Sequence, residues 1–206
     1  MKDPLFAKRT FIEKLRSMRF DERDLKLIEN AVQLLGTTNF KDPKKKNYSA
    51  HPLRVAGYVM SYDPSVEAAT VVLALLHNML EVADLLPSEV RDQFGEWVYQ
   101  SCFVFKVDRA RQKSDQAYLK DFYSQFKSDR RLLLIKMFDK FDNVLSLYFN
   151  PDQEVRRRYL DEIEHWLIPC ISDCDALMRD AFLRLIAGTR SAQPVSMDTF
   201  LTKGTA

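Results

Sequence analysis

Glycine, cysteine and histidine are all scarce in this sequence of 206 residues, which contains 5 Gly, 3 Cys and 3 His. Strand-rich folds use glycine at many of their turns, so the low glycine content favours a helical protein. Three cysteines cannot form a complete disulfide framework, and no cationic segment followed by an apolar one opens the chain. We therefore expect a protein of a reducing compartment, the cytoplasm.

Long apolar runs and a large excess of charge of one sign are also missing. The apolar runs are too short and too often interrupted to cross a bilayer, so the sequence predicts no membrane partner. The formal net charge is only +2, which does not indicate a general affinity for nucleic acid. No pattern in the sequence specifies an oligomeric state.

Apolar residues recur with the period of an α-helix along most of the chain, which predicts an all-α fold. One helix should run unbroken over 63–83, with Asp63 as its N-cap and a buried, apolar middle. A second buried helix is expected over 128–149. A last helix should cover 172–187 and stop at Gly188.

The same periodicity divides the chain into three parts. Residues 1–19 form an N-terminal helical extension, and 20–188 form one domain of ordinary size. The periodicity is lost over 189–206, which predicts a loosely ordered C-terminal tail. Within the domain, the helix that starts near Pro151 should end or kink at Pro169, because proline lacks a backbone N–H.

Two polar residues lie in the most apolar helices of the chain, His77 in one and Asp139 in the other. A carboxylate among leucine, isoleucine, methionine and phenylalanine is costly unless it is paired or bound to a cation. His51 opens a further helix, and Asn78 follows His77. Two imidazoles, a carboxylate and an amide oxygen suit a divalent ion such as Mn, Fe, Co or Zn. The alternative is a buried hydrogen bond between His77 and Asp139 without a metal.

Two further charged features lie close to these residues in the sequence. Glu81 follows His77 by four residues, so on one continuous helix both would share a face, where a general acid or base could act on water. The alternative for Glu81 is an exposed helix carboxylate. A lysine run precedes the His51 helix and could hold phosphate oxygens, or form only a solvated loop: Lys41, Lys44, Lys45 and Lys46.

Four segments, taken together, resemble the hydrolase domain of the RelA/SpoT family: "YSAHPLRVA", "ALLHNMLE", "SEVRDQFGEWV" and "LLLIKMFDKFDNV". The segment "KDPKKKNYSAHP" is particularly similar to the small stand-alone members of that family, and the likeness covers roughly residues 20–170. The resemblance implies an HD-domain helical bundle around one Mn ion. It also implies the reaction, removal of the 3′-pyrophosphate from ppGpp or pppGpp, and hence a guanosine polyphosphate or related nucleotide as the partner.

The resemblance implies four metal ligands: His51, His77, Asn78 and Asp139. The family has aspartate where Asn78 stands, so one ligand charge is lost and the expected metal affinity falls, to the point that the ion could be absent. Glu81 matches a catalytic glutamate that activates the attacking water. The aspartate that follows this glutamate in the family is Val82 here.

The resemblance also implies a set of substrate-binding residues: Lys41, Lys44, Lys45, Lys46, Tyr48 and Asn143. The arginine that usually stands just upstream of Lys41 is absent from "TTNF". This departure, with Asn78 and Val82, favours a second hypothesis, a catalytically degenerate HD domain that binds a nucleotide or a protein. A third is a phosphohydrolase of another nucleotide, with the same scaffold and a changed pocket.

Overall fold

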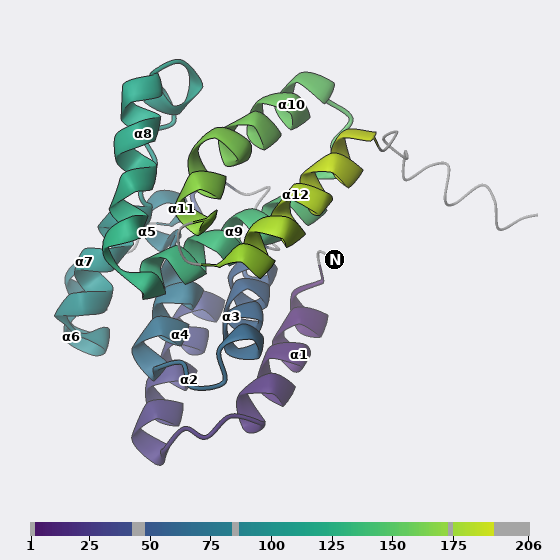
Figure 1. Cartoon of the computed structure of the whole chain (residues 1–206). Coiled ribbons are helices and arrows are strands. Elements are labelled where there is room, and N and C mark those ends of the chain that lie inside the picture. Colours follow the sequence, from purple (N-terminus) through teal and green to yellow (C-terminus); the bar gives the residue numbers. More distant parts are fainter. Residues whose placement is uncertain (1–2, 43–47, 84–86, 173–174, 192–206) are drawn as a thin grey trace, which may run out of the picture. The chain divides into compact units, whose positions relative to one another are not determined.

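The computed structural model describes residues 3–42, 48–83, 87–172 and 175–191 (Figure 1). All of the regular elements in these ranges are helices, and the only strand-like pairing there is an isolated antiparallel bridge between Phe40 and Ala83. The predicted all-α fold is therefore confirmed. None of the described helices is both long enough and apolar enough to cross a membrane.

The chain divides into two compact units, residues 1–138 and 139–206. The division falls inside helix α9 (Arg130–Leu147), which is continuous through it. The predicted boundaries of an N-terminal extension and a C-terminal tail stay predictions. Residues 192–206, most of that tail, lie outside the described ranges.

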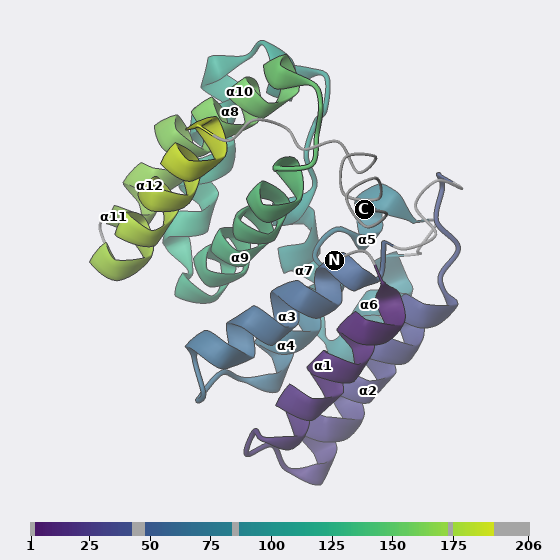
Figure 2. The ribbon, with the colours of Figure 1, turned by 90° about the vertical axis from the view of Figure 1, so that its right-hand side faces the viewer.

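The first unit opens with helices that pack around one buried helix (Figure 2): α1 (Pro4–Arg16), α2 (Glu22–Thr37), α3 (Ala50–Tyr62) and α4 (Ala68–Leu76). Helix α1 packs against α3, while α2 and α3 both pack against α4. Asp21 caps α2 as expected, since its side chain accepts the N–H of Asp24. Residues 70–76 of α4 are buried all round, which confirms the predicted central helix.

Shorter elements complete the first unit: α5 (Met79–Val82), α6 (Pro87–Phe94), α7 (Glu96–Phe105), the 3-10 turn η2 (Arg111–Lys113), α8 (Gln116–Ser124) and the 3-10 turn η3 (Gln125–Ser128). Phe105, Phe122 and Phe126 pack edge to face in a small aromatic cluster. The amine of Lys136, on α9, lies 5.0–5.6 Å from the three ring centroids. Cation–π attraction makes this burial of a lysine tolerable.

The predicted unbroken helix over 63–83 is wrong in two places. Asp63 closes α3 as its C-cap, and α4 begins only after Glu67. The Asp63 carboxylate accepts hydrogen bonds from the backbone and hydroxyl of Ser65, so it forms a turn instead of a helix start. The chain then breaks again at His77 and Asn78, before α5. Asparagine competes with helical hydrogen bonding, and Asn78 has φ −107° and ψ 3°, outside the helical range.

The second unit holds the end of α9 and four further elements: α10 (Gln153–Glu162), the π-helical turn η4 (Ile163–Leu167), α11 (Ile168–Ser172) and α12 (Ala176–Ser191). The interruption expected at Pro169 is present as the π-turn, in which Ile168 N–H bonds the Ile163 carbonyl. Proline cannot donate to the preceding turn and its ring crowds a carbonyl there, so a wider turn relieves the conflict.

The last helix does not stop at Gly188, as the sequence predicts, but continues to Ser191. Thr189 is buried, and its hydroxyl donates to the Leu185 carbonyl one turn earlier. Its own carbonyl accepts a bond of 2.5 Å from the guanidinium of Arg156, which is buried too. This tertiary hydrogen bond stabilises the final turn, so the helix continues past Gly188 despite the low helix propensity of glycine.

An ionic cluster fixes the start of α9 within the first unit. The Arg131 guanidinium stacks on the Trp97 ring at 4.0 Å and bonds the Asp129 carboxylate at 2.8 Å. Trp97 Nε1 donates to the same carboxylate, and Arg131 also reaches Glu67 at 3.1 Å. The hydrogen bonds from Arg131 are the main reason why the pKa of Asp129 lies below its usual value.

The lowered pKa of Asp129 gives a prediction about stability and pH. A carboxyl whose pKa is lowered by folding stabilises the protein above its ordinary pKa of about 4, and this stabilisation disappears as the pH falls through the folded value. Asp129→Asn should therefore lower the melting temperature by about 2–4 °C at pH 7, and less as the pH falls below about 4. Thermal melts of both proteins across this range measure the effect, with Asp180→Asn, which removes a carboxylate paired with Arg179, as control. A deficit that is the same at every pH would contradict the ionic explanation.

Candidate metal centre

His77 occupies the C-cap of α4 and is 1% exposed. Its Nδ1 lies 2.8 Å from the carbonyl oxygen of Ala74. A carbonyl oxygen only accepts hydrogen bonds, so Nδ1 must donate and, in the neutral ring, Nε2 carries the lone pair. This is the arrangement in which a histidine binds a metal through Nε2 while the backbone orients the ring.

A row of aromatic rings holds the two candidate histidines. The His51 ring packs edge-on against His77, with 5.4 Å between the centroids, and Tyr48 lies 5.9 Å from His51 on the other side. Phe105 of α7 packs against His77 at 5.5 Å. His51 is the second residue of α3, and the contact of α3 with α4 brings the two imidazoles together.

Asp139 is 4% exposed and directly follows Phe138 in the continuous helix α9. The Phe138 ring packs against Tyr58 and Tyr62 of α3, which fixes this part of the helix in the first unit. One helical turn after Asp139, the Asn143 amide donates to its carboxylate at 2.8 Å. The burial predicted for His77 and Asp139 is confirmed.

Three of the four predicted ligands come together. His51, His77 and Asp139 each offer one ligand atom, and these atoms all lie within 4.8 Å of one another. Coordination bonds of about 2.0–2.2 Å place the donors of one ion up to about 4.4 Å apart, so small movements close the site. Two imidazole nitrogens and a carboxylate oxygen suit a borderline divalent ion, and the residues therefore fit the implied metal.

Asn78, the fourth predicted ligand, lies at the break between α4 and α5. Its backbone carbonyl accepts the N–H groups of Glu81 and Val82, so it caps the short helix α5. Its side chain is half-buried. Ligation by the Asn78 amide oxygen stays a prediction.

Glu81 does not share a continuous helix with His77, because the chain breaks between them. It is not an exposed helix carboxylate either, since its side chain is only 18% exposed. Its Oε1 accepts a hydrogen bond of 2.6 Å from Nε of Arg109, and Nη2 of Arg109 makes an ion-pair contact of 2.6 Å with the same oxygen. Arg109 lies 28 residues from Glu81 in a polar turn, and no pattern in the sequence links the two.

The segment that begins the lysine run, Phe40 and Lys41, contacts the end of the same short helix, α5. Lys41 N–H donates to the Val82 carbonyl at 3.0 Å, and Phe40 bridges to Ala83, so the described start of the loop lies beside the end of α5. The Lys41 side chain is exposed, whereas Val82 is 5% exposed. The other three predicted lysines lie outside the described residues: Lys44, Lys45 and Lys46. The substrate-binding roles of these lysines, Tyr48 and Asn143 stay predictions.

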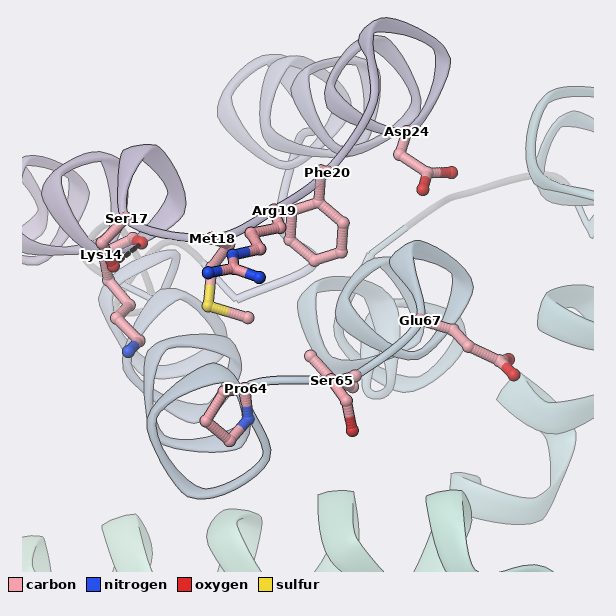
Figure 3. Close-up of a pocket in the computed structure, with 10 residues that line it drawn as sticks. Lys14, Ser17, Met18, Arg19, Phe20, Asp24, Pro64, Ser65 and Glu67 are labelled. Carbon is pink, nitrogen blue, oxygen red and sulfur yellow. Dashed lines mark hydrogen bonds between the residues drawn. The ribbon is translucent and has the colours of Figure 1, made fainter.

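Two other features of the first unit do not form a comparable site. Cys102 lies beside the Leu76 carbonyl, but burial raises the pKa of its thiol to about 12, so the thiolate that metals prefer is disfavoured. Figure 3 shows an open cavity of about 680 Å³ between the α1–α2 and α3–α4 turns. Arg19 and Asp24 both line it, and these opposite charges indicate no single class of ligand.

Comparison with known proteins finds relatives named as pyrophosphohydrolases and relatives named as GTP pyrophosphokinases. No family model matches the chain. The chain is 35% identical over 104 residues to the guanosine-3′,5′-bis(diphosphate) 3′-pyrophosphohydrolase of Aquifex aeolicus, a match that covers 49% of this chain and 14% of that protein. It is 28% identical over 123 residues to the enzyme of that name called MESH1 in Drosophila melanogaster, covering 58% of this chain and 68% of that protein.

A solved structure supports the fold independently. The structure described as a metazoan ortholog of SpoT that hydrolyses ppGpp superimposes with a TM-score of 0.63 over 85% of this chain and 99% of that chain, at 21% identity. The chain is thus similar in sequence to these pyrophosphohydrolases and shares the fold of the metazoan SpoT ortholog. It spans only a small part, 14%, of the Aquifex relative, whereas it covers nearly the whole of the small metazoan structure. The HD fold implies a divalent metal, and the histidine–aspartate cluster provides the place for it.

The burial of His77 gives a prediction for this HD-type fold. His77→Ala removes a buried ring, its bond to Ala74 and its packing against His51 and Phe105, so we expect a loss of about 2–4 kcal/mol of unfolding free energy. Denaturant unfolding in the presence of a chelator measures this loss without a metal contribution. His165→Ala, at an exposed position on η4, is the matched control. A melting curve for His77→Ala that coincides with the wild type would contradict the burial.

Proposed function

We propose that the chain is a metal-dependent phosphohydrolase that removes the 3′-pyrophosphate from ppGpp or pppGpp. The observation that carries this proposal is the cluster of His51, His77 and Asp139, in a fold shared with a ppGpp-hydrolysing protein. Two of the relatives are named as enzymes of this reaction. Packing alone would not require the buried His77 and Asp139 beside the half-buried His51.

The reaction is a hydrolysis in which water attacks the phosphorus bound to the 3′ oxygen. The new bond joins the water oxygen to that phosphorus, and the bond from phosphorus to the 3′ oxygen breaks. The 3′ oxygen takes up a proton, so that GDP or GTP leaves together with pyrophosphate. A divalent ion, for which we propose Mn²⁺, supplies Lewis-acid polarisation of the reacting oxygens when it is bound.

The residues of the chain have separate parts in this reaction. His51, His77 and Asp139 hold the ion, with the Asn78 amide oxygen as a neutral fourth ligand. The Asn143 amide keeps the Asp139 carboxylate in one orientation. Glu81 accepts the proton of the attacking water, as a general base next to the ligand helix.

The phosphates and the nucleoside meet the loop before α3. Lys41, whose backbone is held by α5, and the three lysines of the same loop provide positive charge for the pyrophosphate. Tyr48, in the row of rings beside His51, and Asn143 are the proposed contacts to the nucleotide. The partner is therefore a guanosine polyphosphate.

A second candidate function is a nucleotide-binding or protein-binding module without catalysis. Two residues favour it. Asn78 brings no charge to the ligand set, and the buried Val82 places an aliphatic side chain where the family has a carboxylate. With Asp139 as the only ligand carboxylate, the site attracts a divalent cation less strongly than a site with two.

Turnover of ppGpp separates the two candidates. Purified protein incubated with ppGpp and millimolar Mn²⁺ should release pyrophosphate, and both a chelator and His77→Ala should abolish the release. Absence of turnover by folded protein would contradict the hydrolase and favour the binding module. A thermal-shift screen of nucleotides on the same sample then identifies a phosphohydrolase or binder of another nucleotide, because a bound ligand raises the melting temperature.

A further inference from the structure

Arg109 and Glu81 form a closely defined pair. Arg109 Nε donates to the carboxylate oxygen Oε1 at 2.6 Å, and Nη2 makes an ion-pair contact of 2.6 Å with the same oxygen. The third guanidinium nitrogen, Nη1, donates to Gln112 at 2.9 Å. The guanidinium is thus held on both sides, although the Arg109 side chain is 59% exposed. Charge-assisted bonds of this kind are the strong ones, because both partners are ionised.

The turn that carries Arg109 is itself fixed. The Asp108 carboxylate accepts the N–H groups of Ala110 and Arg111, which caps the 3-10 turn after Arg109. The Asp108 N–H donates to the hydroxyl of Tyr118 on α8 at 2.8 Å. The backbone on each side of Arg109 is therefore anchored, and the arginine approaches Glu81 from a defined direction.

The bonds from Arg109 make the two oxygens of Glu81 different. Oε1 is held by the hydrogen bond from Nε and the ion-pair contact with Nη2, whereas Oε2 is buried and has no hydrogen-bond partner among the described residues. A carboxylate that could turn freely would present either oxygen. Here the turn is blocked, and Oε2 is left as the acceptor for a proton.

We propose that Arg109 is a positioning residue that holds Glu81 in the orientation in which Oε2 accepts the proton of the attacking water. This inference rests on the proposed hydrolase function. Val82 explains why such a residue matters in this chain: it is apolar and buried, so no second carboxylate follows Glu81 to share the proton. Orientation of the single remaining carboxylate then depends on Arg109.

The test compares kcat and KM for ppGpp hydrolysis with Mn²⁺ in wild type, Arg109→Ala and Arg109→Lys. The matched control is Arg111→Ala, which removes an arginine of similar exposure from the same turn, one bonded to Asp115 instead of Glu81. We expect Arg109→Ala to lower kcat by about 10–100-fold with KM within about twofold, because part of the general-base contribution is lost. Arg109→Lys should keep an intermediate kcat, and the control should stay near wild type.

A double-variant cycle distinguishes positioning from a direct or purely structural role. In a Glu81→Gln background, Arg109→Ala should cause no further loss of kcat, since the group that it positions is already gone. Unchanged kcat in Arg109→Ala, an effect on KM alone, or additive losses in the cycle would each overturn the inference. If Arg109→Ala does not fold at the assay temperature, the same comparison of kcat is made with Arg109→Lys, alone and combined with Glu81→Gln. Inactive wild type would instead overturn the proposed function, and this inference with it.

Discussion

The hydrogen bond between His77 Nδ1 and the Ala74 carbonyl is the constraint on which the rest of the site depends. It lies at the end of the most apolar helix of the chain, where a polar ring is tolerated only if its nitrogens are satisfied. The bond fixes both the tautomer and the direction of the ring. His51 and Phe105 then pack against its two sides, so that one backbone carbonyl determines where the imidazole nitrogen Nε2 lies.

The break after His77 connects this constraint to the proposed catalytic residue Glu81. Helix α4 ends there, and α5 follows as a separate short helix with the Asn78 carbonyl as its cap. The short helix carries Glu81 on one side and, through Val82 and Ala83, holds the beginning of the lysine loop. In the proposed mechanism, this interruption of the helix separates the ligand His77 from the general base Glu81, and the contact with Arg109 keeps that base in one orientation.

The sequence predicted the parts of this account that depend on local pattern. Apolar periodicity identified the buried middle of α4. The energetic cost of burying the Asp139 carboxylate led to the prediction that it contacts His77 or shares a cation with it. The break at Asn78 was not predicted, because apolar residues recur with helical spacing on both sides of it. The bond from Asn143 to Asp139 follows from i, i+4 spacing and was open to prediction. The pair of Arg109 with Glu81 was not, since only the tertiary fold brings residues so far apart in sequence together.

The central claim is that His51, His77 and Asp139 form a divalent-metal centre, weakened by the neutral Asn78. Calorimetric titration of Mn²⁺ into wild type, Asp139→Asn and Asn78→Asp tests it most directly. The account predicts one Mn²⁺ per chain in the wild type, loss of that binding in Asp139→Asn, and about 10–100-fold tighter binding in Asn78→Asp, as expected when a ligand carboxylate is restored. An affinity for Mn²⁺ that is unchanged by both substitutions would contradict the metal centre.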